Sequence, residues 1–454
     1  MFGFLINVMK ILSLKLNNKP LENKRNQPAF KGLGSITHSI QSNTLMNRAF
    51  LSVFGFSIPF AFNANSKAER NERYINSVWY TAVAFLSPIL ILPFINKQVL
   101  KKGGIVKKLK DKGVDILKVS KEYLNKDASK MMEGIKKKGK ELGLQKEFDE
   151  LLEKFPDKEK LRKKLIDCHK NIFKWDFLTT SVAVTANPWI TNIYTRLATG
   201  RTGYAGEFEM TDKNYTKKQT VNHEKNRYKK MIVSFAIAIA PALIIPGFLA
   251  KAMKKNPANL KGLSKWINQN AQKFDYKDAK YMSLLTYATM WTTGDYPTYL
   301  LACRDKHELK YKAISNFILG AFYFAGDKIL NSLTGRAFDR FKGTKIMNPK
   351  GYEKAGFFKK LFMPMKPLKE IMNITGKIGK KTGKYAIGMY WGNLALTAAI
   401  IGVGMPRFLN VILRKDVKSD LAKEKSNNIY NSMPPEAKNI FKYFIQRAQR
   451  KDYS

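Results

Sequence analysis

Charge-free apolar runs constrain the fold of this chain more than any other feature. The run from Ser77 to Ile95, SVWYTAVAFLSPILILPFI, contains no charged residue, and its length is roughly the 20 residues that an α-helix needs to cross a bilayer. Similar runs recur along the chain, whereas a soluble domain spreads its apolar residues at helical or strand periodicity. The sequence therefore predicts an all-α, polytopic (multi-pass) membrane protein with about six or seven transmembrane helices.

The apolar runs resemble one another in detail. Pro88 and Pro93 enclose the letters ILIL, and Pro241 and Pro246 enclose the letters ALII. Both runs follow a basic stretch that contains a tyrosine, and both are followed by two consecutive lysines. This likeness indicates an internal repeat, so we expect the transmembrane helices to form repeated hairpins.

A second signature marks the ends of apolar segments. A proline, an asparagine and a basic residue follow one another at intervals of four residues in three triplets: Pro59, Asn63 and Lys67; Pro188, Asn192 and Arg196; Pro406, Asn410 and Arg414. Another segment keeps Pro297 and Arg304 but has Leu301 in place of the asparagine. The recurrence predicts three helical hairpins and one terminal helix.

The gaps between charged residues divide the chain into hairpins and loops. The predicted order is an N-terminal interfacial helix and linker (1–47), membrane hairpin 1 (48–96), a charged helical loop (97–174), membrane hairpin 2 (175–250), a basic loop (251–280), membrane hairpin 3 (281–333), a basic loop (334–384), a final membrane helix (385–414) and a polar tail (415–454). An apolar helical face in the charged loop predicts a small extramembrane bundle; it consists of Phe148, Leu151, Leu152 and Phe155. Because Asp295 interrupts hairpin 3, the sequence leaves open whether both of its segments cross fully.

The chain is strongly basic. It holds 81 Lys and Arg against 35 Asp and Glu, a formal net charge of +46, and 15 of the 81 are Arg. Dispersed lysines attract anionic surfaces without specific recognition, so anionic membrane lipids are the expected partners and nucleic acid is less favoured. An AT-rich genome would produce the same lysine excess. If all seven predicted segments cross the membrane, the side that holds the N-terminus carries 54 Lys and Arg and the opposite side carries 27. By the positive-inside rule this favours a cytoplasmic N-terminus. Without loop 97–174 the two counts are 30 and 27.

The triplets predict a polar stripe inside the membrane. Residues at i, i+4 and i+8 share one helix face, so the asparagine would lie about 6 Å, and the proline about 12 Å, from the base at the interface. Asn63, Asn192 and Asn410 are candidates for a shared mid-membrane site, and they would equally serve as packing contacts between helices. The prolines expected to kink helices are Pro59, Pro88, Pro93, Pro188, Pro241, Pro246, Pro297 and Pro406, and the expected interface anchors are Lys67, Arg196, Arg304 and Arg414.

Asp295 is the most informative single residue. It precedes Arg304 by nine residues, which places it about 13 Å below the interface, where a carboxylate needs a partner, water or a proton. Lys328 of the following segment is the expected counterion. Asp295 would then belong to a proton or cation relay, to a structural ion pair, or to a segment that never crosses the membrane.

No sequence pattern points to catalysis, a metal or a cofactor. Ligand spacing is absent among the histidines and cysteines, which are His38, His169, His223, His307, Cys168 and Cys303. The glycine-rich stretch 376–383 lacks the contiguous GK[ST] of a phosphate loop and predicts a flexible basic linker. No nucleophile can be paired with a base, so an enzyme is the least supported class.

Two functions remain open on sequence alone. Repeated hairpins and buried polar residues favour a transporter-like membrane protein that binds or moves a small solute, with an anion among the candidates. The size of the basic loops favours the alternative, a membrane scaffold whose loops hold anionic lipid, nucleic acid or a protein partner. A polar cavity at mid-depth would favour transport, and a closed, dry bundle would favour scaffolding.

Overall fold

The computed structural model describes Thr37, residues 50–86, 91–105, 113–271, 276–277, 281–282, 284–374 and 376–438, and Ile440. Over these residues the fold is all-α, as predicted, apart from a short antiparallel hairpin of β1 (Tyr276–Lys277) and β2 (Tyr281–Met282). The predicted N-terminal interfacial helix in 1–47, Thr37 aside, and the predicted kink at Pro88 lie outside the described residues.

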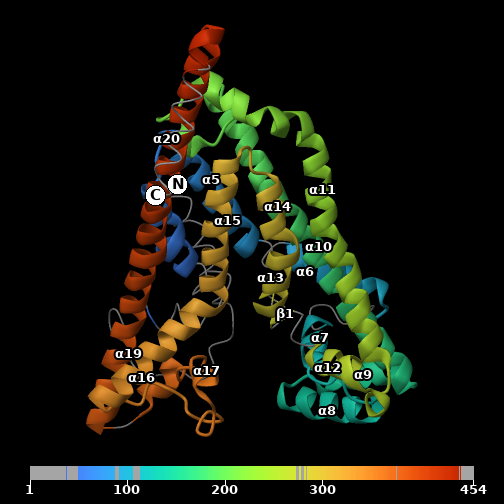
Figure 1. The fold of residues 1–454 in the computed structure, drawn as a ribbon. Helices are drawn as coiled ribbons and strands as arrows, with labels where there is room; N and C mark the ends of the chain where they lie inside the picture. The colour runs from blue at the N-terminus through green and yellow to red at the C-terminus, as the bar shows by residue number, and fades with distance from the viewer. Residues whose placement is uncertain are drawn as a thin grey trace.

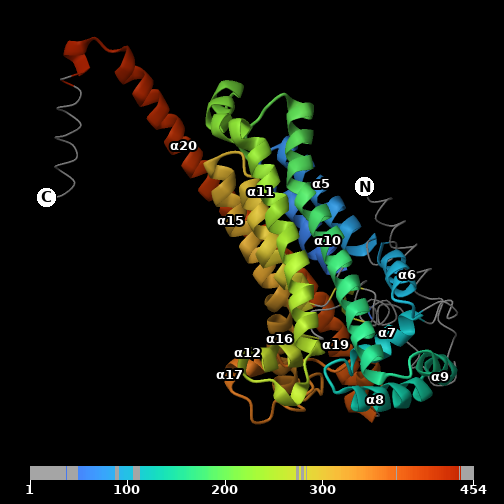
Figure 2. The same cartoon turned by 90° about the vertical axis from the view of Figure 1, so that its right-hand side faces the viewer.

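Long helical rods lie side by side, and successive rods run in opposite directions (Figures 1 and 2). In chain order the rods are η2–α4 (Leu51–Ser57 and Ile58–Phe62), α5 (Lys67–Leu86), α10 (Lys158–Thr199), α11 (Lys213–Lys254), α13–η7–α14 (Leu284–Met290, Trp291–Asp295 and Tyr296–Leu301), α15–η8–α16 (Lys306–Ala321, Phe322–Gly326 and Asp327–Lys342) and α19–η9–α20 (Gly376–Thr397, Ala398–Gly404 and Met405–Ser432). Connections at residues 63–66, 200–212 and 302–305 join rods at one end of the molecule, which we call the turn end. The connection 200–212 contains the 3-10 helix η4 (Ala205–Glu207).

A widened helical turn precedes a proline in three rods. The stretches η2, η7 and η9 are π-helical, and the N–H after each bonds to a carbonyl five residues earlier, in the pairs Ile58–Val53, Tyr296–Trp291 and Met405–Ile400. Pro59, Pro297 and Pro406 follow directly. Because proline has no N–H and its ring crowds the preceding turn, the wider turn lets the rod continue past it. The stretch η8 is also π-helical, and no proline follows it.

The other predicted kink prolines that the structure describes lie within or at the start of helices. Pro188 lies inside α10, and Pro241 and Pro246 lie inside α11, each a continuous helix of 42 residues. Pro93 stands in the first turn of α6 (Leu92–Lys102), where the helix has no use for the N–H that proline lacks.

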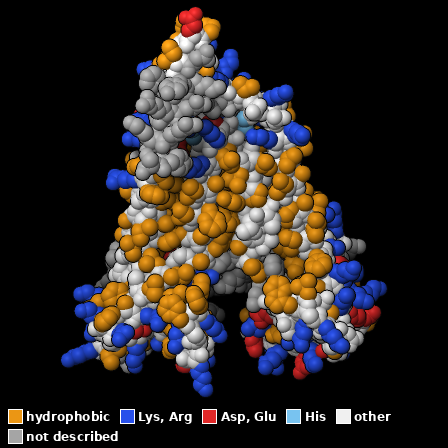
Figure 3. Space-filling model, viewed as in Figure 1, with side chains coloured by type: hydrophobic (Ala, Val, Ile, Leu, Met, Phe, Trp, Pro, Cys, Tyr) orange, Lys and Arg blue, Asp and Glu red, His pale blue; other side chains and the backbone are white. Residues whose placement is uncertain are grey.

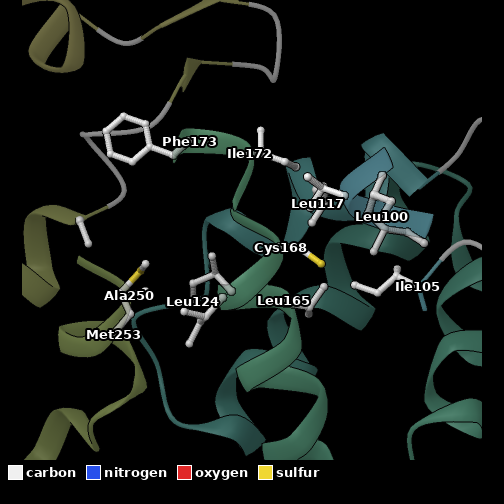
Figure 4. Packing of buried hydrophobic residues seen from close by; sticks show 14 of the residues in the cluster. Leu100, Ile105, Leu117, Leu124, Leu165, Cys168, Ile172, Phe173, Ala250 and Met253 are labelled. Carbon is white, nitrogen blue, oxygen red and sulfur yellow. The ribbon is translucent and has the colours of Figure 1, made fainter. Parts of the chain in front are cut away.

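A lysine-rich lobe surrounds the ends of α10 and α11 that lie away from the turn end (Figure 1). It contains α6, α7 (Gly113–Lys121), α8 (Ala128–Glu141), α9 (Gln145–Lys154), η5 (Pro257–Asn259) and α12 (Gly262–Asn270). Figure 4 shows Leu100, Leu117 and Leu124 packed beside Leu165 and Cys168 of α10. The apolar face predicted for this region is largely buried, at Phe148, Leu151 and Phe155. The lobe is therefore a packed bundle continuous with the rods.

A second, smaller lobe lies at the ends of α16 and α19 (Figure 1). It contains α17 (Phe357–Lys360) and α18 (Leu368–Met372). Its core consists of Ile346, Met347, Leu368, Ile371, Ala386 and Met389. The two lobes lie apart at the lower edge of Figure 3.

The structure moves three predicted boundaries because helices continue through charged sequence. Helix α10 begins at Lys158, where the Asp157 carboxylate accepts hydrogen bonds from two backbone N–H groups, so the boundary predicted between residues 174 and 175 falls inside it. The stretch 376–383, predicted as a flexible linker, is the start of α19, and α20 runs to Ser432 through part of the predicted polar tail. Lysine and glutamate are good helix formers, so a change from apolar to charged residues does not end a helix.

Hydrophobic side chains form a belt across the middle of the molecule. Figure 3 shows them gathered over α11, α14, α15 and α20, with Lys and Arg above and below. Two helical stretches in the described chain, Lys213–Lys254 and Gly376–Ser432, are long and apolar enough to cross a membrane. Apolar side chains on both are exposed: Ile232, Ile244 and Val411 show 68%, 66% and 67% of their surface.

Candidate functional site

A cavity of about 250 Å³ lies between the rods η2–α4, α5, α13–η7–α14 and α15–η8–α16. Three of the widened turns contribute to its wall, η2 with Phe56, η7 with Trp291 and Asp295, and η8 with Phe324. Helices α5 and α15 begin at the turn end (Figure 1). The charged residues near the starts of these helices that line the cavity, Glu69, Glu72, Arg73 and Lys312, therefore lie at its end nearest the turn end.

Ion pairs close the cavity at the turn end. Glu72 of α5 accepts from Arg304 Nη1 at 2.7 Å and from Nη2 at 3.1 Å. Arg304 also donates to Glu308 from Nε and Nη2, at 2.9 and 2.8 Å, and Lys312 Nζ lies 2.6 Å from the same carboxylate. Arg304 and Glu308 are 4% and 0% exposed, so this network is desolvated.

A second group of bonds completes the closure. Arg73 Nη2 lies 2.6 Å from Glu69 Oε1 and donates to the Tyr311 hydroxyl at 2.7 Å, while Nη1 donates to the Phe60 carbonyl at 2.5 Å. The Tyr204 hydroxyl donates to Glu69 at 2.6 Å. We call the six charged residues of both groups the charged roof; they are Glu69, Glu72, Arg73, Arg304, Glu308 and Lys312. The roof holds equal numbers of carboxylates and bases, so its formal charges cancel.

Glu308 and Arg304 stay ionised because they are paired. Burial alone would raise the pKa of Glu308, but the charges of Arg304 and Lys312 hold it well below its usual range. Burial would likewise lower the pKa of Arg304, and the carboxylates of Glu308 and Glu72 raise it well above its usual value. Removing one member would leave its partner as a buried, unpaired charge.

Asp295 lies deeper in the cavity wall, and its partner is not the predicted one. Both carboxylate oxygens accept from the Tyr80 hydroxyl, at 2.7 and 2.8 Å, where the sequence predicted Lys328. Asp295 is 5% exposed, and no salt bridge from a described residue reaches it. The Tyr80 ring stacks on Tyr299 with centroids 6.2 Å apart. The structure thus pairs a buried carboxylate with a neutral phenol.

Aromatic rings line the cavity away from the turn end. Tyr287 lies 5.6 Å from Tyr323 and 5.9 Å from Phe324, between ring centroids, and Trp291 lies 5.6 Å from Phe324. All four residues line the cavity, and we call them the aromatic floor. The spacings are those of interacting rings, so α13–η7 and α15–η8 meet through a continuous aromatic contact.

A histidine at the turn end bridges two carboxylates. His307 Nδ1 lies 2.6 Å from Glu207 Oε1, and Nε2 lies 3.0 Å from Asp420 Oδ2. Ligand atoms of Glu207, Asp305 and His307 lie within 4.8 Å of one another, a spacing that a metal ion could bridge. Because both ring nitrogens already bind carboxylates, we interpret the group as a hydrogen-bonded cluster that ties α15 to η4 and α20.

Protons are held tightly in this cluster. Burial, then the charges of Glu207 and Glu308, raise the pKa of the Asp305 carboxyl from 3.8 to about 7. Burial lowers the pKa of His307, but the hydrogen bond and charge of Glu207 raise it by more than burial lowers it. The pKa of His307 is therefore raised overall. The upward shift favours the protonated imidazole, the form that pairs with two carboxylates.

The three asparagines of the predicted stripe do not share one site. Asn410 Nδ2 donates to the Asn63 carbonyl at 2.8 Å, and Asn410 Oδ1 accepts from Asn65 Nδ2 at 2.8 Å. Asn192 instead donates to the Ala302 carbonyl at 2.8 Å. None of the three lines the central cavity. Asn410 thus joins α20 to the connection after α4, and Asn192 joins α10 to the connection before α15.

The four predicted interface anchors lie in different surroundings, three at the surface and Arg304 in the interior. Lys67 is exposed at the start of α5, Arg196 pairs with Glu224 at 2.8 Å, and Arg414 donates to Asn65 at 3.3 Å. Arg304 does not anchor at a membrane surface. It is buried in the charged roof, where the carboxylates of Glu72 and Glu308 pair with it.

Sequence reasoning missed the charged roof because its members come from the short connections between apolar segments. The available signal was local: acidic residues are scarce in this chain, yet Glu69 and Glu72 stand beside Arg73, and Asp305 and Glu308 stand beside Arg304. The aromatic floor gave no signal, since single aromatic residues in apolar segments are common.

Comparisons with known proteins do not place this cavity in a family. No protein-family model, no curated protein and no solved structure matches the chain. What the protein does is therefore inferred from the belt, the cavity and the charges around it.

Proposed function

We propose that the chain is a multi-pass membrane protein of transporter-like build that binds or moves a small solute through the central cavity. Six or seven rods cross the bilayer in this proposal, and hairpins 1 and 3 enclose the solute. The lysine-rich lobes lie on one side, which the positive-inside rule makes cytoplasmic.

The exposed apolar surface supports the membrane location. In a soluble protein, helices as apolar as α11 would be buried in the core, whereas Ile232 and Ile244 of α11 and Val411 of α20 are largely exposed. The belt in Figure 3 has charged residues on both sides of it, as expected where hydrocarbon covers the middle of a protein and water its ends.

The observation that carries the solute-binding proposal is the cavity itself. It lies among the rods. Four residues of the charged roof line one end, Glu69, Glu72, Arg73 and Lys312, the aromatic floor lines the other, and Asp295 lies between them. Polar groups converging in an otherwise apolar cavity are the usual form of a ligand site. Its walls include widened turns, which recur at functional sites in helices.

The recurrence of a widened turn before a proline supports the repeated-hairpin part of the proposal. Pro59, Pro297 and Pro406 each follow such a turn in rods that run toward the turn end. The same feature before the proline in several rods is what an internal repeat would produce.

A membrane scaffold is the second candidate, and the lobe around α10 and α11 favours it. The lobe packs on α10 and α11 through one continuous core and carries the longest lysine-rich segment, so in this proposal it presents a folded, basic surface beside the bilayer. Anionic lipid headgroups are the partners that such a surface would attract, at about 1 kcal/mol per basic residue near the membrane.

Membrane integration is tested by alkaline carbonate extraction of cell membranes. The protein should stay in the pellet with integral proteins. Its release into the supernatant would contradict the membrane location.

The solute cavity is tested by cysteine accessibility in intact membranes. Asn316 lines the cavity and is half-buried, so Asn316→Cys should react with a small methanethiosulfonate reagent. Ser332 is fully buried outside the cavity, and Ser332→Cys is the matched control that should be protected. Equal protection at both positions would favour the scaffold over the solute site.

A further inference from the structure

We propose that the central cavity binds a small organic cation, such as a quaternary or primary ammonium compound, with Asp295 as its counterion and the aromatic floor as its wall. This inference rests on the proposed function and names the substrate class of the same site. It differs from the sequence expectation, which included anions.

Among the described residues that line the cavity, the Asp295 carboxylate has no cationic partner. Within the charged roof each base has a carboxylate partner, Arg73 with Glu69, Arg304 with Glu72 and Lys312 with Glu308. Asp295 has the neutral Tyr80 hydroxyl at 2.7 and 2.8 Å. A buried carboxylate needs a proton or a positive partner, and a cationic solute would supply that partner from the cavity side.

An anionic solute would find no free base among the described residues that line the cavity, because both of their bases, Arg73 and Lys312, are engaged. Arg73 is engaged with Glu69, Tyr311 and the Phe60 carbonyl, and Lys312 is held by Glu308 at 2.6 Å. An anion would have to break one of these buried pairs, which leaves the displaced carboxylate unpaired. It would also meet Asp295 as a like charge.

The aromatic residues suit an ammonium group. The face of an aromatic ring attracts a cation within about 6 Å of its centroid, most strongly for tryptophan. Trp291 lies in the same widened turn as Asp295, and its ring is 5.2 Å from Tyr296 and 5.6 Å from Phe324, between centroids. A cation held by Asp295 would therefore lie beside several ring faces.

The cavity is built for a small ligand. Its volume of about 250 Å³ is at or below the lower end of the range for drug-sized sites. At Gly320 an added Cβ would lie 2.2 Å from Trp291 Cζ2, so a glycine is what lets the indole occupy its place in the wall. The glycine thus maintains the aromatic surface that the cation would contact.

Three probes of one shape and different charge test the inference. Choline is the cation, 3,3-dimethylbutan-1-ol is its neutral isostere, and 3,3-dimethylbutanoate is the related anion. Their binding to the purified full-length protein is measured by calorimetry. We expect choline to bind at least about tenfold more tightly than the alcohol, and the anion to bind more weakly still.

Variants assign the preference to the named residues. Asp295→Asn keeps the shape of the side chain and should reduce the affinity for choline about tenfold or more, to near that of the alcohol. Trp291→Leu should also weaken choline binding. Asp149→Asn, at an exposed position in α9, is the matched control and should change nothing. If Asp295→Asn does not fold, the comparison of the three probes on the unchanged protein still tests whether the cavity prefers a cation.

The outcomes separate this inference from the function on which it rests. Tighter binding of the anion, equal binding of all three probes or no binding at millimolar concentrations would overturn the cation inference. The labelling of Asn316→Cys would then still test the solute cavity, because this labelling does not depend on the charge of the solute.

Discussion

Arg304 binds both carboxylate oxygens of Glu72, with distances of 2.7 and 3.1 Å, although 232 residues separate them in the chain. Glu72 also accepts from the Thr195 hydroxyl at 2.5 Å. One carboxylate thus joins α5 to α10 and to the connection before α15. This contact closes the cavity at the turn end and holds three hairpins at a fixed distance.

Replacing Arg304 should destabilise the protein strongly. Arg304→Met removes the base shared by Glu72 and Glu308 and leaves two buried carboxylates with fewer partners, so we expect a loss of about 3 to 5 kcal/mol in the free energy of unfolding. Unfolding of the purified protein by heat or denaturant measures it. Arg340→Met, at an exposed position of α16, is the control and should change the free energy by less than about 0.5 kcal/mol.

A double-mutant cycle separates the ion pair from general packing. If the pair matters, Glu72→Gln combined with Arg304→Met should cost less than the sum of the single changes, because neither unpaired charge remains. Additive losses would show that Glu72 and Arg304 do not interact energetically, and would contradict the roof as described.

The His307 cluster should make stability depend on pH. Asp305 and His307 both have a raised pKa in the folded protein, so the folded state binds more protons than the unfolded state, and the free energy of unfolding falls as the pH rises. The contribution of Asp305 is full below pH 3.8 and is lost as the pH passes about 7. That of His307 is full below pH 6.5 and is lost above it.

Thermal unfolding between about pH 5 and pH 9 tests this dependence. The midpoint should fall across the range, and His307→Gln should flatten the curve because the amide keeps hydrogen bonds and cannot titrate. A curve with the same slope in the variant, or a midpoint that rises with pH, would show that other groups control stability.

The sequence predicted the rods well and the connections poorly, for a physical reason. Apolar runs such as 177–195 and 231–250 lie inside α10 and α11, because burial in lipid or protein requires continuous apolar sequence. The lengths of α10 and α20 could not be predicted, because Lys and Glu favour helix in water as well. Nothing between Lys158 and Phe177 signals a stop, so α10 continues.

The candidate site was predicted in part. Asp295 was recognised because a carboxylate in an apolar segment is costly and therefore informative. Its partner Tyr80 was not, since a hydroxyl on another hairpin leaves no mark in the local sequence. The asparagine pattern recurs, but its residues do not line the cavity. The spacing indicated equivalent positions for Asn63 and Asn410 in their segments. It could not show that these two residues bond to each other while Asn192 bonds elsewhere.

The asparagines should affect stability and not solute binding. Asn410→Leu removes the bonds to Asn63 and Asn65 and should lower the free energy of unfolding by about 0.6 to 2 kcal/mol. Asn192→Leu removes one bond, to Ala302, and should cost no more than that. Unfolding and choline binding are measured on the same preparations. Loss of choline binding at unchanged stability would restore the shared-site hypothesis.

Replacing Gly320, which lines the cavity, should destabilise the protein. Gly320→Ala places a methyl group 2.2 Å from Trp291 Cζ2, and since the indole packs against Phe324 and Tyr296 it cannot move without disturbing them, so we expect a loss of about 1 to 3 kcal/mol in the free energy of unfolding. Gly388 in α19 has no atom within 4 Å of an added Cβ, and Gly388→Ala should be neutral or stabilising by up to about 1 kcal/mol, because alanine favours helix. Thermal unfolding and the fluorescence of the tryptophans measure both variants. If Gly320→Ala behaves like Gly388→Ala, Trp291 does not occupy the cavity wall as described.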